Sequence, residues 1–169
     1  LNIEAMSYGY GTVDVTKVKK ALAIAKFYHN GQLRKSGLPY FSHPVAVAIM
    51  VANYLFKTDV IIAAILHDTI EDTTLTYNII KDEFGRRVEE MVYRLTRIRE
   101  GKKISVKTIL EESHEHGDYE VLVIKQCDRV HNMETIYAMK PEKQKEIAIE
   151  TLEEFLIFSI NNEIPEITN

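Results

Sequence analysis

Seven consecutive apolar residues, VIIAAIL at 60–66, run directly into the polar sequence HDTIED at 67–72. Such a run is apolar on almost every side of a helix, so we expect that helix to lie in the interior of the protein. Burying the carboxylates that follow is costly unless they form hydrogen-bonded ion pairs or bind a metal ion. This segment therefore predicts a helical protein in which one buried helix delivers ionisable side chains into the fold.

The rest of the chain has the same helical character. Apolar residues recur at intervals of three and four, and Gly and Pro separate the segments in which they do so. The segment 118–139 opens with β-branched residues and would also suit a strand, but a helical period fits it better. We expect a charged loop at 99–103 and helices within residues 14–30, 44–56, 58–69, 74–84, 86–98, 104–116, 118–139 and 141–160. The predicted fold class is all-α, a helical bundle of about seven to eight or more helices.

Length and composition agree with one globular domain. The chain has 169 residues, of which 46% are hydrophobic and 27% charged, as is usual for a folded domain of this size. We expect a flexible lead-in at 1–13, the domain at 14–160 and a C-terminal tail at 161–169.

Charge and cysteine content exclude several classes of protein. With 21 Lys and Arg against 25 Asp and Glu, the net charge is −4, which argues against a nonspecific nucleic-acid binder. We expect no membrane partner, because no stretch approaches the ~18 apolar residues of a membrane span and the first residues lack the pattern of a signal peptide. The single cysteine, Cys127, cannot form an intrachain disulfide and favours a cytoplasmic location.

The spacing within HDTIED suits a metal site. His67 and Asp68 would point about 100° apart on a helix and could reach one ion between them. Glu71 and Asp72 follow four residues after them, so both acids return to the same face one turn later. The alternative is a helix end whose acids lie in solvent and whose histidine is an ordinary core residue.

Two further clusters offer ligands of the same kind. In IKQCDRVHN at 124–132, Asp128 falls on an apolar helix face, although a surface pair with a neighbouring basic residue would also explain it. In RKSGLPYFSHP at 34–44, His43 stands where an apolar helix begins, a position that a hydrogen-bonding histidine could equally occupy.

Together the three clusters define a candidate ligand set: His43, His67, Asp68 and Asp128. Imidazoles and carboxylates without a thiolate suit a six-coordinate Mn²⁺, Fe²⁺ or Mg²⁺ with open positions better than a closed structural zinc. Open positions let water and substrate bind together, as metal-assisted hydrolysis requires.

These clusters carry a family resemblance. The segments HNGQLRKSGLPYFSHP, AAILHDTIEDT, FG at 84–85 and VIKQCDRVHNMETI, followed by AIETL, resemble the metal-dependent HD phosphohydrolases. More narrowly, they resemble the hydrolase domain of the RelA/SpoT alarmone enzymes of the stringent response, especially the stand-alone small alarmone hydrolases. The resemblance implies an HD-type bundle that removes the 3′-diphosphate of guanosine tetra- or pentaphosphate, (p)ppGpp. The products would be GDP or GTP and pyrophosphate, with one Mn²⁺ per chain as cofactor.

The resemblance also implies a role for each matching residue. The residues that match the metal ligands are His43, His67, Asp68 and Asp128. The acidic pair that positions and deprotonates the attacking water corresponds to Glu71 and Asp72. Residues near the guanine correspond to Arg34 and Lys35, and residues near the sugar and phosphates to Lys125, Arg129 and Asn132. Tyr40 either lines the nucleotide pocket or packs beneath its loop, and we include it with the substrate contacts.

Other functions stay open at this point. The chain could act on another nucleotide or on a 3′-phosphorylated cofactor, bind an alarmone without turnover, or form a bundle whose polar residues are merely paired. Two smaller expectations concern neighbouring residues. His131 should point away from the metal cluster by helical phase. The following basic residues should form a solvated segment rather than a site for distal phosphates: Arg97, Arg99, Lys102, Lys103 and Lys107.

Overall fold

The computed structural model describes residues 12–99 and 101–161. The lead-in expected at 1–13 and the tail expected at 161–169 therefore lie outside the described residues, apart from Thr12, Val13 and Asn161. Within those ranges, no helix is both long enough and apolar enough to cross a membrane.

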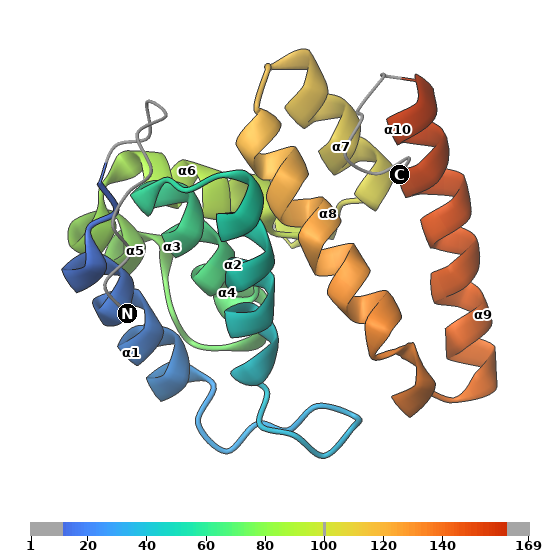
Figure 1. Cartoon of the computed structure of the whole chain (residues 1–169), viewed down its shortest axis with the longest axis horizontal. Coiled ribbons are helices and arrows are strands. Elements are labelled where there is room, and N and C mark those ends of the chain that lie inside the picture. Colours follow the sequence, from blue (N-terminus) through green and yellow to red (C-terminus); the bar gives the residue numbers. More distant parts are fainter. Residues whose placement is uncertain (1–11, 100, 162–169) are drawn as a thin grey trace.

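Helices make up the fold, as the sequence predicts (Figure 1). The N-terminal part contains α1 (Val15–Tyr28), α2 (Ser42–Tyr54), α3 (Thr58–Leu66), α4 (Thr69–Asp72), α5 (Tyr77–Phe84) and α6 (Arg86–Leu95). An antiparallel hairpin of β1 (Ile98–Arg99) and β2 (Lys102–Lys103) leads into α7 (Val106–Glu115) and α8 (Tyr119–Glu134). The C-terminal part contains the 3₁₀ turn η1 (Ile136–Ala138), α9 (Pro141–Glu150), the π-helical segment η2 (Thr151–Leu156) and α10 (Ile157–Asn161). The prediction of a charged loop at 99–103 is wrong, because the chain pairs there across a turn in which Gly101 has a φ of 76°.

Side-chain caps fix where several helices begin. Asp14 accepts a hydrogen bond from the backbone N–H of Lys17 at the start of α1, and Thr76 accepts one from Ile79 at the start of α5. These caps satisfy N–H groups that have no partner inside the helix. Helix α3 has no such side-chain cap: Thr58 is its first residue, and the Thr58 hydroxyl instead accepts from the backbone N–H of Asp14.

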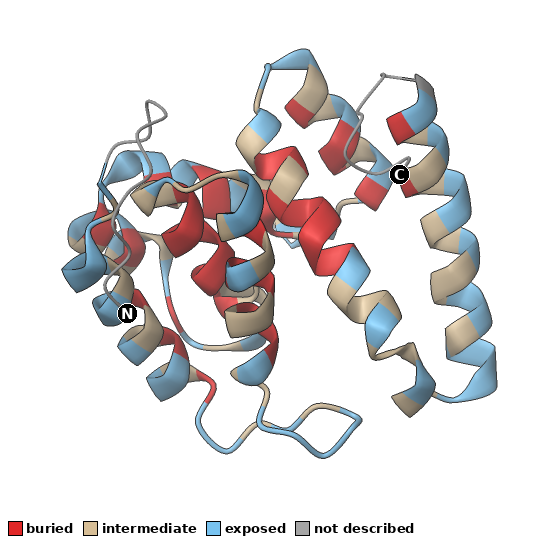
Figure 2. Cartoon of the chain, viewed as in Figure 1, coloured by how far each residue is buried: buried red, intermediate tan, exposed pale blue. Residues whose placement is uncertain are grey.

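Helix α3 lies at the centre of the bundle, packed against α1, α2 and α6 and also touching α8. Its residues Val60–Leu66 are all buried, and Figure 2 shows the buried residues concentrated around it. Since burying an aliphatic side chain contributes about 1.5–3 kcal/mol, this run anchors the fold. The helix ends at Leu66, however, and a turn at His67 and Asp68 precedes α4, where the sequence suggested one continuous helix.

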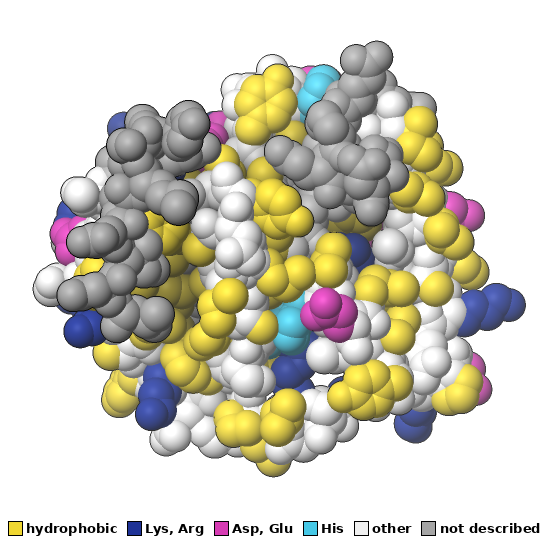
Figure 3. Space-filling view, viewed as in Figure 1, with side chains coloured by type: hydrophobic (Ala, Val, Ile, Leu, Met, Phe, Trp, Pro, Cys, Tyr) yellow, Lys and Arg dark blue, Asp and Glu magenta, His cyan; other side chains and the backbone are white. Residues whose placement is uncertain are grey.

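Helix α8 connects the two parts of the core. Val121 and Ile124 belong to the large cluster around α3, whereas Leu122 packs in a smaller cluster with α7 and Phe155 of η2. Helix α9 contributes no buried residue to either cluster. The face shown in Figure 3 carries basic and acidic side chains interspersed with hydrophobic ones.

Candidate metal centre

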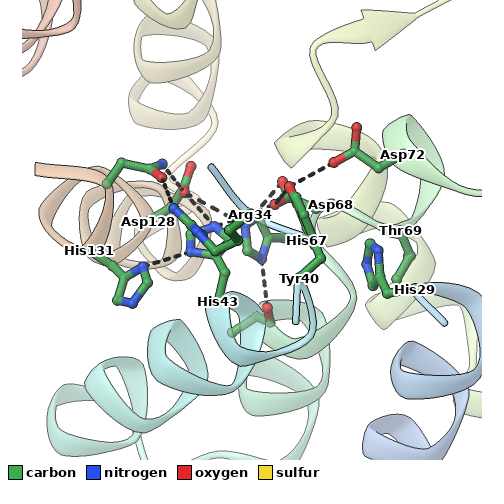
Figure 4. A network of polar contacts seen from close by, with 12 residues as sticks. His29, Arg34, Tyr40, His43, His67, Asp68, Thr69, Asp72, Asp128 and His131 are labelled. Atoms are coloured by element: carbon green, nitrogen blue, oxygen red, sulfur yellow. Dashed lines mark hydrogen bonds and ion pairs between the residues drawn. The ribbon is translucent and has the colours of Figure 1, made fainter. Parts of the chain in front are cut away.

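Three segments of the bundle bring their polar side chains to one point (Figure 4). His43 lies in the first turn of α2, His67 and Asp68 follow α3 directly, and Asp128 lies on α8. Nε2 of His43 is 3.4 Å from Asp68 Oδ2 and 3.2 Å from Asp128 Oδ1. Nε2 of His67 is 3.1 Å from Asp68 Oδ1 and 3.7 Å from Asp128 Oδ1. The four side chains drawn from three separate motifs therefore converge.

The spacing of these atoms fits a single metal ion. One ligand atom each from His43, His67 and Asp128 lies within 4.8 Å of the others, and all three residues are buried. Asp68 adds a carboxylate at ion-pair distance from both imidazoles. A set of two nitrogens and two carboxylates suits divalent ions that prefer mixed nitrogen and oxygen ligands.

The hydrogen bond at the other side of the His67 ring fixes which nitrogen faces the centre. Nδ1 of His67 lies 2.7 Å from the carbonyl oxygen of Ala64. Because a carbonyl only accepts, Nδ1 carries the proton, and a neutral ring keeps a lone pair on Nε2. That Nε2 is buried and has no hydrogen-bond partner of good geometry among the described residues. A buried nitrogen held in this way is suited to coordinate a metal.

The ring of His43 is held by another side chain, His131, which was expected to point away from the cluster. Nδ1 of His43 lies 2.8 Å from Nδ1 of His131, and the two ring centroids are 4.8 Å apart. The expectation that His131 points away from the cluster is wrong. Residues three apart on a helix lie on the same face, so His131 shares a face of α8 with Asp128. Burial lowers the pKa of His131 to about 4, with a further contribution from His43, which keeps this ring neutral.

Electrostatics in the centre favour negative carboxylates around a positive charge. Burial alone would lower the pKa of His67, but the charges of the neighbouring Asp68 and Asp128 carboxylates outweigh burial and hold that pKa well above its usual value. Burial alone would raise the pKa of Asp68 and of Asp128, yet the adjacent imidazoles, and Lys125 for Asp128, hold both well below the usual range. A bound cation would satisfy the same carboxylates.

Tyr40 connects the centre to the acidic residues at its edge. Its hydroxyl lies 2.8 Å from Asp68 Oδ2 and 2.7 Å from Asp72 Oδ2, so its single proton is shared between two carboxylates. Burial and the two acidic neighbours raise the pKa of Tyr40, which therefore stays protonated. Its ring stacks on His29 at a centroid distance of 4.7 Å. Tyr40 therefore faces the candidate centre and packs against His29 at the end of α1.

The second acidic residue, Glu71, is also oriented. Its Oε1 accepts a hydrogen bond from the backbone N–H of Arg97, just after α6. Burial raises the pKa of Glu71 and of Asp72 above their usual values, although the bonds from Arg97 and Tyr40 act in the opposite direction. Both carboxyls are therefore better proton acceptors than free carboxylates.

A cleft of about 410 Å³ lies between the N-terminal helices, α8 and α9, and the candidate site opens into it. Every site residue named from the sequence lines it except His67, which is buried behind the surface. Arg97 also lines the cleft, contrary to the expectation that it lies in a solvated segment. The basic residues of the cleft are Arg34, Lys35, Arg97, Lys125, Arg129 and Lys143.

Several of the predicted substrate contacts already have protein partners. Arg34 donates to Asn132 Oδ1 at 3.1 Å, and Asn132 in turn donates to Asp128 Oδ1 at 2.7 Å. The ammonium group of Lys125, itself buried, lies 3.1 Å from Asp128 Oδ2. Arg129 pairs with Glu150 and lies over the ring of Phe155. Lys35 is exposed.

One side of the cleft, formed by α9, was not predicted from the sequence. Lys143, Ile147 and Glu150 line it, and Glu150 also pairs with Arg97. Their helical spacing of three and four places them on one face of α9. Nothing in the sequence indicated that this face turns toward α8.

Comparison with known proteins agrees with the resemblance seen in the motifs. The family model for the HD domain matches residues 21–159. The chain is 37% identical over 145 residues to the bifunctional (p)ppGpp synthase/hydrolase SpoT of Escherichia coli K12, covering 82% of this chain and 21% of that protein. It is 37% identical over 163 residues to a guanosine-3′,5′-bis(diphosphate) 3′-pyrophosphohydrolase of Aquifex aeolicus, covering 89% and 23% of the two chains. A protein of the same name from Haemophilus influenzae is 40% identical over 139 residues, covering 77% and 20%.

The chain spans about a fifth of the length of these curated relatives. A solved structure of a metazoan SpoT ortholog, described as hydrolysing ppGpp, is closer in extent. It superposes with a TM-score of 0.69 at 24% identity, covering 80% of this chain and 82% of that one. This likeness confirms the helical fold.

Proposed function

Because this chain belongs to the HD domain family, we propose that it is a metal-dependent phosphohydrolase that removes the 3′-diphosphate of (p)ppGpp. The reaction releases pyrophosphate and leaves GDP or GTP. The observation that carries this proposal is the convergence of His43, His67, Asp68 and Asp128 at a cleft with six basic side chains. The names of the relatives support the choice of substrate.

We assign His43, His67, Asp68 and Asp128 to hold the ion, and we propose Mn²⁺. Two features support this assignment: the buried Nε2 of His67 has no hydrogen-bond partner of good geometry among the described residues, and the ligand set contains no thiolate. A divalent ion bound there would supply Lewis acidity, lowering the pKa of a water molecule and withdrawing charge from a phosphoryl oxygen.

Glu71 and Asp72 are the proposed acceptors of the proton that the attacking water loses. Their raised pKa values bring them closer to the operating pH of a general base. Tyr40 donates to the carboxylates of Asp68 and Asp72 and so holds Asp72 beside the centre. The backbone bond from Arg97 orients Glu71 in the same way.

The basic side chains of the cleft suit a substrate with several negative charges. The protein as a whole has a net charge of −4, so attraction of a polyanion must come from a local concentration of positive charge. Arg34 lies 6.0 Å from the centroid of the Tyr40 ring, and guanidinium and phenol groups both offer planar surfaces on which a purine could stack. We propose that Arg34, Lys35 and Tyr40 contact the guanine side of the substrate.

We propose that three other cleft residues lie near the sugar and phosphates of the substrate: Lys125, Arg129 and Asn132. Arg129 would then exchange its pairing with Glu150 for a phosphate oxygen. We also propose that the protein acts in the cytoplasm as part of the stringent response, since a lone cysteine suits a reducing compartment.

The test is an assay of metal-free and Mn²⁺-loaded protein against ppGpp, with the products identified by chromatography. We expect pyrophosphate and GDP in equal amounts from the loaded protein and neither from the metal-free protein. GDP and GTP, which lack the 3′-diphosphate, serve as matched control substrates and should stay intact. Loss of phosphate from the 5′ position, or binding of ppGpp without turnover, would contradict the proposal.

A further inference from the structure

We infer that His131 is a positioning residue: it accepts a hydrogen bond from Nδ1 of His43 and thereby keeps the lone pair of His43 Nε2 directed at the metal. This inference rests on the proposed metal site. It gives a role to a histidine that was expected to point away from the metal cluster.

The contact between the two rings admits only one donor. Their Nδ1 atoms are 2.8 Å apart, so one nitrogen must carry the proton and the other must accept it. On its opposite side, Nε2 of His43 faces Asp128 Oδ1 at 3.2 Å. A metal ligand needs a lone pair at that Nε2, and a neutral imidazole has only one proton. With a metal bound, that proton must therefore lie on His43 Nδ1, and His131 must be the acceptor.

The second imidazole of the centre shows the same arrangement with a different acceptor. His67 directs its Nδ1 to the carbonyl oxygen of Ala64 at 2.7 Å. That acceptor belongs to the backbone of α3, so no substitution of a side chain removes it. For His43 the acceptor is a side chain on another helix, α8, which makes the tautomer of His43 dependent on residue 131.

Helix α8 thus supplies both a proposed ligand and the group that orients another. Asp128 and His131 are three residues apart, and both reach His43: Asp128 through Nε2 and His131 through Nδ1. Without the acceptor, the buried Nδ1–H of His43 would lose its partner. The alternative tautomer, protonated at Nε2 and donating to Asp128, would then gain population and compete with the metal.

Calorimetric titration with Mn²⁺ alone, without nucleotide, tests this inference on the full chain. His131→Leu removes the acceptor, and loss of such a partner typically weakens metal affinity about 10–100-fold. His131→Asn retains an acceptor oxygen near the position of Nδ1, and we expect it to restore most of the affinity. His116→Leu is the matched control, because it removes an exposed histidine at the end of α7 whose ring hydrogen-bonds the carbonyl oxygen of Glu112. Wild-type affinity in His131→Leu, or equal losses in the Leu and Asn variants, would overturn the inference.

A spectroscopic measurement on the wild-type protein covers the case in which His131→Leu does not fold. Nitrogen NMR of the Mg²⁺-loaded protein should show His43 protonated at Nδ1 and His131 unprotonated at Nδ1. The reverse assignment would overturn the inference. Neither measurement involves ppGpp, so a failure of the proposed substrate would leave this result standing and could be told apart from it.

Discussion

Replacement of Tyr40 by Phe tests whether the Tyr40 hydroxyl sets the pKa of Asp72, a proposed proton acceptor. The hydroxyl of Tyr40 lies 2.7 Å from Asp72 Oδ2 and favours the charged carboxylate. Burial raises the pKa of Asp72, and the bond from Tyr40 opposes that rise. Removing the hydroxyl should therefore raise the pKa of Asp72 further, so that the acid limb of the rate profile moves to higher pH.

The size of the shift follows from the strength of the bond. A hydrogen bond to a charged group contributes about 1.5–3 kcal/mol, and one pKa unit corresponds to about 1.4 kcal/mol. Although partial burial raises its pKa, Asp72 remains accessible to solvent at the cleft. Water therefore partly replaces the lost donor, and the lower end of that range applies. We expect a shift of about one pH unit, which is about a tenfold loss of rate on the acid limb.

The assay is the initial rate of pyrophosphate release from ppGpp at saturating Mn²⁺, measured across the acid limb and into the plateau. Tyr54→Phe, at the exposed C-terminal end of α2, is the matched control and should leave the profile unchanged. An acid limb that stays in place in Tyr40→Phe, or moves to lower pH, would refute the reasoning.

Three further predictions concern the acceptor, the core and the ion. Asp72→Asn should lower turnover about 10²–10⁴-fold with near wild-type Mn²⁺ affinity by calorimetry; full turnover would exclude Asp72 as the base. Ile62→Ala, at a fully buried position of α3, should lower the free energy of unfolding in urea by about 2–5 kcal/mol, whereas Ile49→Ala on an exposed face should change it by less than about 0.5 kcal/mol. Mn²⁺ at about a hundred times its Kd should raise the free energy of unfolding of the wild-type protein by about 2.7 kcal/mol. The Asp128→Ala variant should lose this gain, and equal stabilisation of the variant and the wild type would argue for a different site.

The helical fold and the convergence of the proposed ligands were predictable because each ligand adjoins an apolar segment. His67 and Asp68 follow the run of α3, His43 opens α2, and Asp128 interrupts an apolar face of α8. An ionisable group in such a place must find a partner in the interior. A small domain has one main core, so three such groups that are buried in it are expected to meet at a common centre.

Two features of the structure were not predicted from the sequence. One depends on packing between helices that are distant in the chain, and the other is too short to leave a sequence pattern. Glu150 and Lys143 line the cleft only because α9 folds back toward α8, and no period within α9 shows which helix it will face. The hairpin at 98–103 has strands of two residues, too short for an alternating pattern. His131 could have been placed correctly, since an interval of three residues keeps it on the same face as Asp128.

Diffraction from crystals soaked in Mn²⁺, with anomalous data at the manganese edge, tests the central claim most directly. We expect one strong anomalous peak per chain, within coordination distance of Nε2 of His43 and His67 and of oxygens of Asp68 and Asp128. A peak at another position, or a fully occupied ion that Asp128 does not reach, would contradict it.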